Sequence, residues 1–274
     1  LPRNFAPTTP AAPLGFAVPD TLVVACWPAV FSVLGAATTD EGLPVVEGLL
    51  DLVHLDHAIE LTGQIPADDT ELIVTARLGE VYDSAVGRVV EVGVDIVRAD
   101  ASADPSAVAT LTERFAIRGR LGAAELADPV RAGGAAADER TATRKHVRTV
   151  KLTAPEDMTG FAVVSGDRNP IHTDVLAARL AGLGDPIVHG MWLSAAAQQV
   201  VTAADLDEPV PSPRALLGWT ARFLGMVRLG DELTVRVDRV GMDAGRDVIE
   251  VTAKVGDDLV MAATGLQAAP RTVY

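Results

Sequence analysis

The sequence predicts an α+β protein in which an antiparallel sheet wraps around a helix, and in which this unit occurs twice in tandem. Apolar stretches typical of buried helices occur near residues 20–37 and 187–201, and segments that alternate between apolar and polar residues follow each of them. A helix that is apolar almost all round needs surrounding structure, and a two-residue period is typical of half-buried strands. In addition, residues 54–80 and 217–242 align with a one-residue difference in length.

The first half opens with seventeen residues that contain four prolines, which favours an extended linker over a helix. The apolar segment 20–37 predicts the first helix. Strands are predicted at 90–96, where valine and isoleucine alternate with polar residues and glycine, and at 111–117. The stretch 121–144 is small and polar and contains a Gly-Gly pair and an alanine run, which predicts a connector.

The second half begins with a predicted strand at 147–152. A helix is predicted next, because Thr153 and Glu156 have the spacing of a capping box. A polar loop at 165–172 then leads to the second apolar helix, and two alternating segments, 233–237 and 249–255, predict closing strands. The predicted organisation is a linker at 1–17, a first unit at 18–120, a connector at 121–144 and a second unit at 145–274.

The length, net charge and cysteine content of the chain exclude some classes of protein and some kinds of partner. A length of 274 residues is enough for about two domains or one large one. The 23 basic and 37 acidic residues give a net charge of −14, which disfavours nucleic acid and anionic membrane surfaces as partners. Cys26 is the one cysteine and cannot form an internal disulfide, so we expect a core residue in a reducing compartment, the cytoplasm. The apolar run 22–37 is shorter than a membrane span and lacks the basic start of a signal peptide.

The segment 161–172, FAVVSGDRNPIH, concentrates polar residues in apolar surroundings. On a helix, Asp167 and His172 would lie about 140° apart and would not share a face. Asn169 is followed by proline, which favours a turn, and a turn can bring the carboxylate and the imidazole together. Such a pair can transfer protons in both directions. The alternative is a polar turn with a capping aspartate and a surface histidine.

Several spaced motifs resemble the MaoC-like, or hydratase 2, family. Residues 165–195, SGDRNPIHTDVLAARLAGLGDPIVHGMWLSA, contain S-G-D-x-N-P-x-H and an H-G-M segment that opens a helix. Residues 221–233, ARFLGMVRLGDEL, are similar to the family pattern R-F-x-x-x-V-x-x-G-D. The resemblance covers about 145–269. It implies a tandem, or double, hot-dog fold whose second half is catalytic, with Asp167 and His172 as the reacting pair.

The first half carries a narrower resemblance. CWPAVFSVLGAA at 26–37 and PVVEGLLDLVHLDHAIEL at 44–61 are similar to the region before the catalytic hot dog in bacterial and fungal type I fatty acid synthases. The proline-rich start and the missing initial Met fit a segment of such a synthase. The first half has no D-x-N-x-x-H motif, since no histidine follows Asp20 within thirty residues. We therefore expect it to be non-catalytic, to complete a pseudo-dimer and to help form the acyl tunnel.

The resemblance implies reversible dehydration of (3R)-hydroxyacyl thioesters to trans-2-enoyl thioesters. In that reaction His172 would take the α-proton, and Asp167 or a water that it holds would protonate the leaving hydroxyl. The backbone N–H of Gly190, at a helix N-terminus, would stabilise the enolate-like oxygen, and Asn169 would orient the loop or the water. Which proton each of Asp167 and His172 handles stays open.

No metal or redox cofactor is expected for this reaction. The substrate would be carried on the phosphopantetheine of an acyl carrier protein or on coenzyme A, and the expected partners include other fatty acid synthase domains. Three alternatives remain: a free-standing (R)-specific enoyl-CoA hydratase, a thioesterase, and a non-catalytic acyl-binding or scaffold module.

The other histidines receive structural interpretations. His54 and His57 lie on a predicted strand, where a spacing of three places them on opposite faces, so a shared metal is disfavoured. His146 lies in a locally basic stretch and is interpreted as part of a solvated strand edge, with a dock for an acidic carrier or a phosphate as the alternative. His189 is expected to cap or brace the second helix. Four further large residues are interpreted as core or tunnel wall: Met191, Trp192, Trp219 and Phe223.

Overall fold

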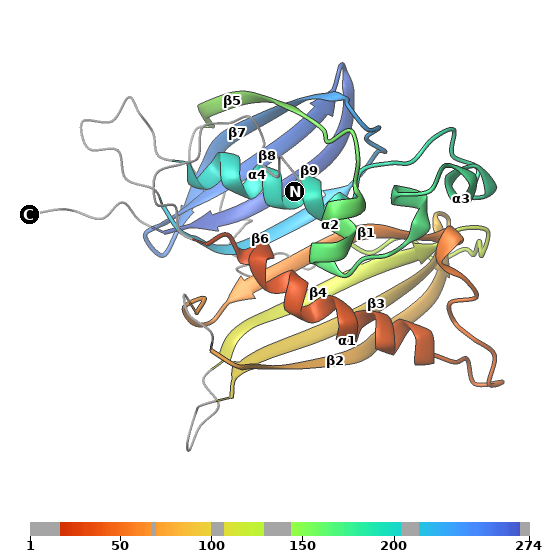
Figure 1. Ribbon diagram of the computed structural model, residues 1–274. Helices are drawn as coiled ribbons and strands as arrows, with labels where there is room; N and C mark the ends of the chain where they lie inside the picture. The colour runs from red at the N-terminus through yellow and green to blue at the C-terminus, as the bar shows by residue number, and fades with distance from the viewer. Residues whose placement is uncertain (1–16, 67–69, 100–106, 129–143, 204–213, 269–274) are drawn as a thin grey trace, which may run out of the picture.

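The computed structural model describes residues 17–66, 70–99, 107–128, 144–203 and 214–268. Within these residues, nine strands form one antiparallel sheet in the order β2-β3-β4-β1-β6-β9-β8-β7-β5 (Figure 1). The predicted linker at 1–17 lies almost wholly outside the described residues, as does most of the predicted connector.

The first half contributes four strands and a central helix. The strands are β1 (Leu52–Leu61), β2 (Leu72–Ser84), β3 (Gly87–Arg98) and β4 (Ala107–Ile117). The helix is α1 (Val23–Ala36), which follows the 3-10 helix η1 (Pro19–Leu22), and a second 3-10 helix, η2 (Leu49–Asp51), precedes β1.

The second half contributes the remaining five strands and three α-helices. Its strands are β5 (Lys145–Thr153), β6 (Leu216–Phe223), β7 (Glu232–Asp243), β8 (Arg246–Val255) and β9 (Asp258–Gln267). The helices are α2 (Thr159–Ser165), α3 (Val175–Leu180) and α4 (Gly190–Thr202), and the 3-10 helix η4 (Pro170–His172) lies between α2 and α3.

The two halves share one strand order when each is traced from its outer edge: β2-β3-β4-β1 in the first and β7-β8-β9-β6 in the second, with β5 added outside β7. They join where β1 pairs with β6, from Asp56 opposite Arg222 to Glu60 opposite Gly218. This order agrees with the predicted alignment, which places β1 on β6 and β2 on β7. The pairing removes an exposed edge from each unit. The predicted tandem α+β fold is thus confirmed.

Each central helix covers its own half of the sheet, α1 the first and α4 the second (Figure 1). The buried face of α1 consists of residues at three- and four-residue spacing: Val23, Cys26, Trp27, Val30 and Leu34. Cys26 is therefore a core residue, as predicted. The run 22–37 is predicted from the sequence to be too short for a membrane span, but the helical segment Pro19–Ala36 is long and apolar enough for one by length and composition alone. Of this segment, 44% is buried inside the protein.

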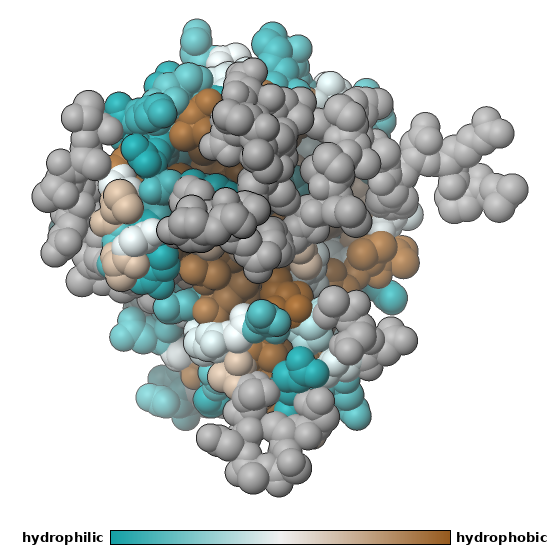
Figure 2. Space-filling view, turned by 90° about the vertical axis from the view of Figure 1, so that its left-hand side faces the viewer, coloured by the Kyte–Doolittle hydropathy of each residue, from teal (hydrophilic) through white to brown (hydrophobic). Residues whose placement is uncertain are grey.

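Exposed apolar side chains are also present. Figure 2 shows hydrophobic residues in the middle of one face, with hydrophilic residues around them. Individual exposed apolar residues are normal on a folded protein.

The predicted strands are confirmed, since the segments at 90–96, 111–117, 147–152, 233–237 and 249–255 lie within β3, β4, β5, β7 and β8. The predicted capping box at Thr153 is wrong. Thr153 ends β5, and the chain stays paired with its neighbour because the Ala154 N–H donates to the Asp231 carbonyl at 2.8 Å. Helix α2 begins only at Thr159, whose N–H and hydroxyl donate to the Asp157 carboxylate.

The second apolar helix also begins later than its apolar stretch. Ile187 forms an isolated bridge with Arg228, and the Val188 N–H donates to the Val227 carbonyl at 2.9 Å. These contacts hold 187–189 extended, so α4 begins at Gly190. The helix N-terminus thus lies beside the polar loop that precedes it.

Candidate active site

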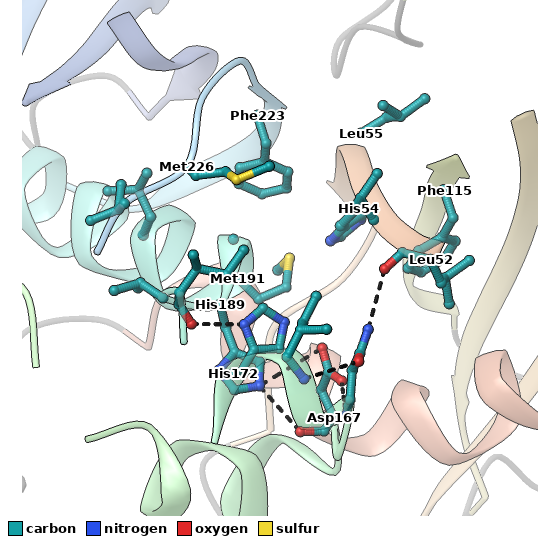
Figure 3. A pocket seen from close by; sticks show the side chains of 18 of the residues that line it. Leu52, His54, Leu55, Phe115, Asp167, His172, His189, Met191, Phe223 and Met226 are labelled. Carbon is teal, nitrogen blue, oxygen red and sulfur yellow. Dashed lines mark hydrogen bonds and ion pairs between the residues drawn. The ribbon is translucent and has the colours of Figure 1, made fainter. Parts of the chain in front are cut away.

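A pocket of about 220 Å³ lies between the two halves of the molecule. The second half supplies most of the polar lining, and the first half supplies apolar and aromatic side chains, one histidine and one arginine, Arg118 (Figure 3). The lining includes all four residues that the sequence predicts for the site, Asp167, Asn169, His172 and Gly190, together with His189.

The polar loop folds back through a series of local hydrogen bonds. Helix α2 ends at Ser165 and is capped by Gly166, whose φ of +79° is left-handed and suits glycine. The Asp167 Oδ1 accepts the Asn169 N–H at 3.0 Å, and the Asn169 Oδ1 accepts the Ile171 N–H at 3.3 Å to begin η4. As a result, ligand atoms of Asp167, His172 and His189 all lie within 4.8 Å of one another. The turn thus brings the carboxylate and the imidazole together as expected.

The neighbours of His172 define its proton-carrying nitrogen. Nδ1 lies 2.9 Å from the Ile187 carbonyl oxygen, and a carbonyl can only accept, so Nδ1 carries the proton. Burial lowers the pKa of His172, and the opposing effect of the Asp167 charge does not restore it. The ring is therefore neutral near pH 7, and its Nε2 has a free lone pair, as a general base requires.

His189 is a second neutral imidazole beside the first. Its ring stacks on that of His172 with centroids 3.7 Å apart, and its Nε2–H donates to the Asp167 carbonyl oxygen at 3.2 Å. Burial and the neighbouring His172 lower its pKa to about 4. The side chain makes no capping bond to α4. It braces the Asp167 loop instead. In the sequence, the H-G-M segment at 189–191 was the feature that indicated a role for this histidine.

Gly190 is the first residue of α4, so its N–H has no acceptor within the helix, and the positive end of the helix dipole lies there. A Cβ atom at this position would lie 3.1 Å from the Phe223 ring. The glycine therefore allows a close approach between the helix start and a wall of the pocket.

Asn169 connects the loop to the first half. Its Nδ2 donates to the carbonyl oxygens of Leu49, at 2.8 Å, and Leu52, at 3.2 Å. Because its Oδ1 also caps η4, the amide is engaged at both ends. Asn169 thus positions the loop, one of the two roles expected for it.

The first half also brings two histidines together, contrary to the sequence prediction. A β-bulge between His54 and Asp56 shifts the register of β1 against β4. The extra residue shifts the two-residue alternation of side chains, so His54 and His57 lie on the same side of the strand. His54 Nε2 lies 2.9 Å from Glu113 Oε2, and His57 Nδ1 lies 2.6 Å from Glu113 Oε1. The predicted opposite orientation is therefore wrong.

His57 is the centre of a buried ionic chain. Its Nε2 donates to Asp20 Oδ1 at 3.0 Å, and this oxygen also accepts the Gln198 amide at 2.6 Å. Burial lowers the pKa of His57, but Glu113 and Asp20 outweigh burial and raise it to about 10. The ring is thus an imidazolium between two carboxylates. Since Asp20 precedes α1 and Gln198 lies on α4, the chain also ties the two central helices together.

Asp167, His172 and His189 are close enough to bind a metal ion as a group. One nitrogen of each imidazole is already bonded to a backbone carbonyl. The sequence predicts no metal here, and this remains a prediction.

A family model described as MaoC like domain matches residues 135–261. A fatty acid synthase beta subunit, stcK, of Emericella nidulans is 34% identical over 127 residues, which are 45% of this chain and 6% of that protein. A 3-hydroxybutyryl-CoA dehydratase of Methylorubrum extorquens is 31% identical over 124 residues, 44% of this chain and 76% of that protein. The chain thus spans a small part of the synthase subunit and most of the dehydratase.

The fold is shared with the crystal structure of HtdX of Mycobacterium tuberculosis. The TM-score is 0.62 at 17% sequence identity, and the match covers 92% of this chain and 88% of that one. At this identity the likeness concerns the fold alone. It extends over both halves of the sheet, whereas the family model matches mainly the second.

Proposed function

The chain belongs to the MaoC-like dehydratase family, and we propose that it removes water reversibly from (3R)-hydroxyacyl thioesters to give trans-2-enoyl thioesters. One observation carries the proposal: a neutral His172 and the carboxyl group of Asp167 lie together in a pocket, beside the N–H of a helix start. In this order they provide the base, the acid and the oxyanion donor that elimination next to a thioester needs.

In the proposed reaction the thioester oxygen binds the Gly190 N–H, which stabilises the negative charge that develops there. His172 Nε2 takes the proton from C2, and its electron pair forms the C2–C3 double bond. The C3–O bond breaks, and the leaving hydroxyl takes a proton on the Asp167 side, from the carboxyl group or from a water bound to it. Water leaves, and a proton returns from His172 to the Asp167 side. The mechanism requires no metal or redox cofactor.

Hydration of a crotonyl thioester, followed by loss of the enoyl absorbance, tests this proposal. We expect His172→Ala and Asp167→Ala each to lower kcat/KM by about 10²- to 10⁴-fold. The melting temperature should change little, because the loop side chains are not part of the apolar core. His146→Ala, on the outermost strand β5, is the matched control and should retain wild-type activity.

Two results would contradict the proposal. A folded His172→Ala variant with the wild-type rate would remove the assigned base. Release of free thiol in step with the loss of absorbance would indicate a thioesterase.

The similarity to synthase beta subunits supports a dehydratase segment of a type I fatty acid synthase as the setting. In that setting the substrate is carried by an acyl carrier protein, and other synthase domains are neighbours. A free-standing (R)-specific enoyl-CoA hydratase would use the same residues on coenzyme A thioesters. Comparison of crotonyl-CoA with crotonyl-acyl carrier protein separates them: a much larger kcat/KM for the protein-bound substrate is expected for the synthase segment.

A further inference from the structure

His54 lies across the pocket from the Asp167 and His172 group (Figure 3). It comes from the first half, in which the sequence predicts no catalytic motif. The wall that the first half contributes is otherwise apolar, with Phe31 and Phe115 among its residues, except for Arg118, whose guanidinium donates to the Leu50 and Ala181 carbonyls. In a pocket with a mostly apolar lining, a few placed polar groups fix the orientation or selectivity of the ligand.

The His54 ring is held from several sides. Its Nε2 bonds to Glu113, its face stacks on Phe115 with centroids 4.7 Å apart, and Trp27 and Phe223 lie at 5.6 and 5.0 Å. Behind Glu113 stands His57, itself bonded to Asp20. The ring therefore cannot turn away from a ligand without breaking a buried hydrogen bond.

The bond to Glu113 also defines which ring nitrogen remains for the pocket. Burial raises the pKa of Glu113, but His57 and the hydrogen bonds from both histidines outweigh burial and lower it, so the group is a carboxylate. A carboxylate only accepts, and His54 therefore donates from Nε2. No hydrogen bond joins Nδ1 to any residue in the described part of the chain. The side chain keeps 13% of its surface exposed, and the pocket is the space that it lines.

Behind His54 lie Trp27 and the ionic chain around His57, which are fully buried. A bulky thioester carrier has no room on this side of the ring, so we assign this side of the pocket to the acyl chain beyond C3. A short chain leaves room for a water on Nδ1. A long apolar chain displaces that water and leaves a buried polar atom without a partner, which is costly.

We propose that His54 is a specificity-determining residue that favours short acyl chains over long apolar ones, with Glu113 as its positioning residue. This inference rests on the proposed function, because it concerns the substrate of the same pocket. It assigns the first half a role in selectivity rather than in chemistry.

The test compares kcat/KM for hydration of crotonyl-CoA and trans-2-octenoyl-CoA by wild type, His54→Leu and His54→Gln. Wild type should prefer the crotonyl substrate. His54→Leu removes the polar atom at similar size, so we expect it to raise the octenoyl-to-crotonyl ratio about tenfold or more. His54→Gln keeps a polar end and should retain the wild-type preference. Leu55→Val, on the same strand, controls for a change of pocket volume alone.

Three results would overturn the inference: an unchanged ratio in folded His54→Leu, an equal loss with both substrates in that variant, or the same ratio shift in Leu55→Val. An equal loss would place His54 on the carrier side. Failure of the proposed function looks different, because wild type would then hydrate neither substrate. Thermal melting of each variant shows that it is folded, and Glu113 keeps His57 as a partner when His54 is replaced.

Discussion

The two halves of the molecule each bring an aspartate and a histidine together beside a central helix, but with opposite results. In the second half, His172 is neutral and opens onto the pocket beside Asp167. In the first half, His57 is sealed between Asp20 and Glu113 and is an imidazolium. The same residue types thus form a reactive pair in one half and a structural ion cluster in the other.

The hydrogen-bond partners of each ring explain this difference. Two buried carboxylates stabilise the charged form of His57 by more than burial destabilises it. His172 faces a peptide carbonyl and another imidazole, so burial dominates and favours the neutral form. The hydrogen-bond partners of a histidine ring therefore decide whether the histidine can act as a base. The presence of an aspartate beside it does not.

The largest effect on stability is expected from the sealed cluster. His57→Leu leaves two buried carboxylates, Asp20 and Glu113, without their shared cation. We expect a loss of about 3–5 kcal/mol in the free energy of unfolding, measured by urea denaturation at pH 7. His146→Leu is the matched control: it removes a half-exposed ring from Asp238, which keeps two arginine partners, and should cost about 0–1 kcal/mol.

The pH dependence of this loss checks its cause. The pKa of His57 is about 10 in the folded protein and near 6.5 in the unfolded chain. Its contribution to stability is therefore complete below pH 6.5 and is lost as the pH rises toward 10. The difference between wild type and His57→Leu should shrink over that range. A difference that stays constant would show that packing, not charge, is the cause.

Asn169 should have a smaller effect, because it holds the loop but carries no charge. Asn169→Ala removes the bonds to the Leu49 and Leu52 carbonyls and the cap of η4. We expect about 1–3 kcal/mol lower stability and about tenfold lower kcat/KM for crotonyl thioester hydration. Unchanged stability with a large loss of kcat would instead mean that the amide contacts the substrate.

Gly190→Ala should cost about 1 kcal/mol of stability, because its Cβ would meet the Phe223 ring at 3.1 Å. Gly190→Val should cost more and should reduce turnover more than stability, since the helix start is displaced from the pocket. A double variant with Gly190→Ala and Phe223→Leu tests the cause, because the smaller side chain should restore part of the stability that Gly190→Ala loses. If the double variant is no more stable than Gly190→Ala, crowding against Phe223 does not cause the loss.

The smallest expected effect is on the pH profile. Burial lowers the pKa of His172, so the base stays unprotonated below the ordinary histidine range. The acid limb of kcat/KM for hydration should therefore lie below pH 6.5 in wild type. An acid limb above pH 6.5 would imply that His172 is protonated in the free enzyme. The two histidines would then carry the same charge, and the difference described above would not hold.

Local patterns in the sequence determined much of this protein. The apolar run 20–37 forms α1, alternation predicts the strands, and the Asn169-Pro170 turn brings Asp167 and His172 together, because each depends on neighbours a few residues away. The motifs at 165–195 were sufficient to indicate the family and its pocket residues.

Only the tertiary structure decided the features that join distant segments. The bulge beside His54 depends on the register of β1 against β4, which no single segment contains. Asp20 meets His57 across 37 positions and Gln198 across 178, and Asn169 reaches Leu52 across 117. The first of these contacts forms because the segment before α1 packs on β1 within the first half, and the other two form because edge pairing of β1 with β6 brings the two halves together. A pattern of neighbouring residues contains no information about partners so far away in the sequence.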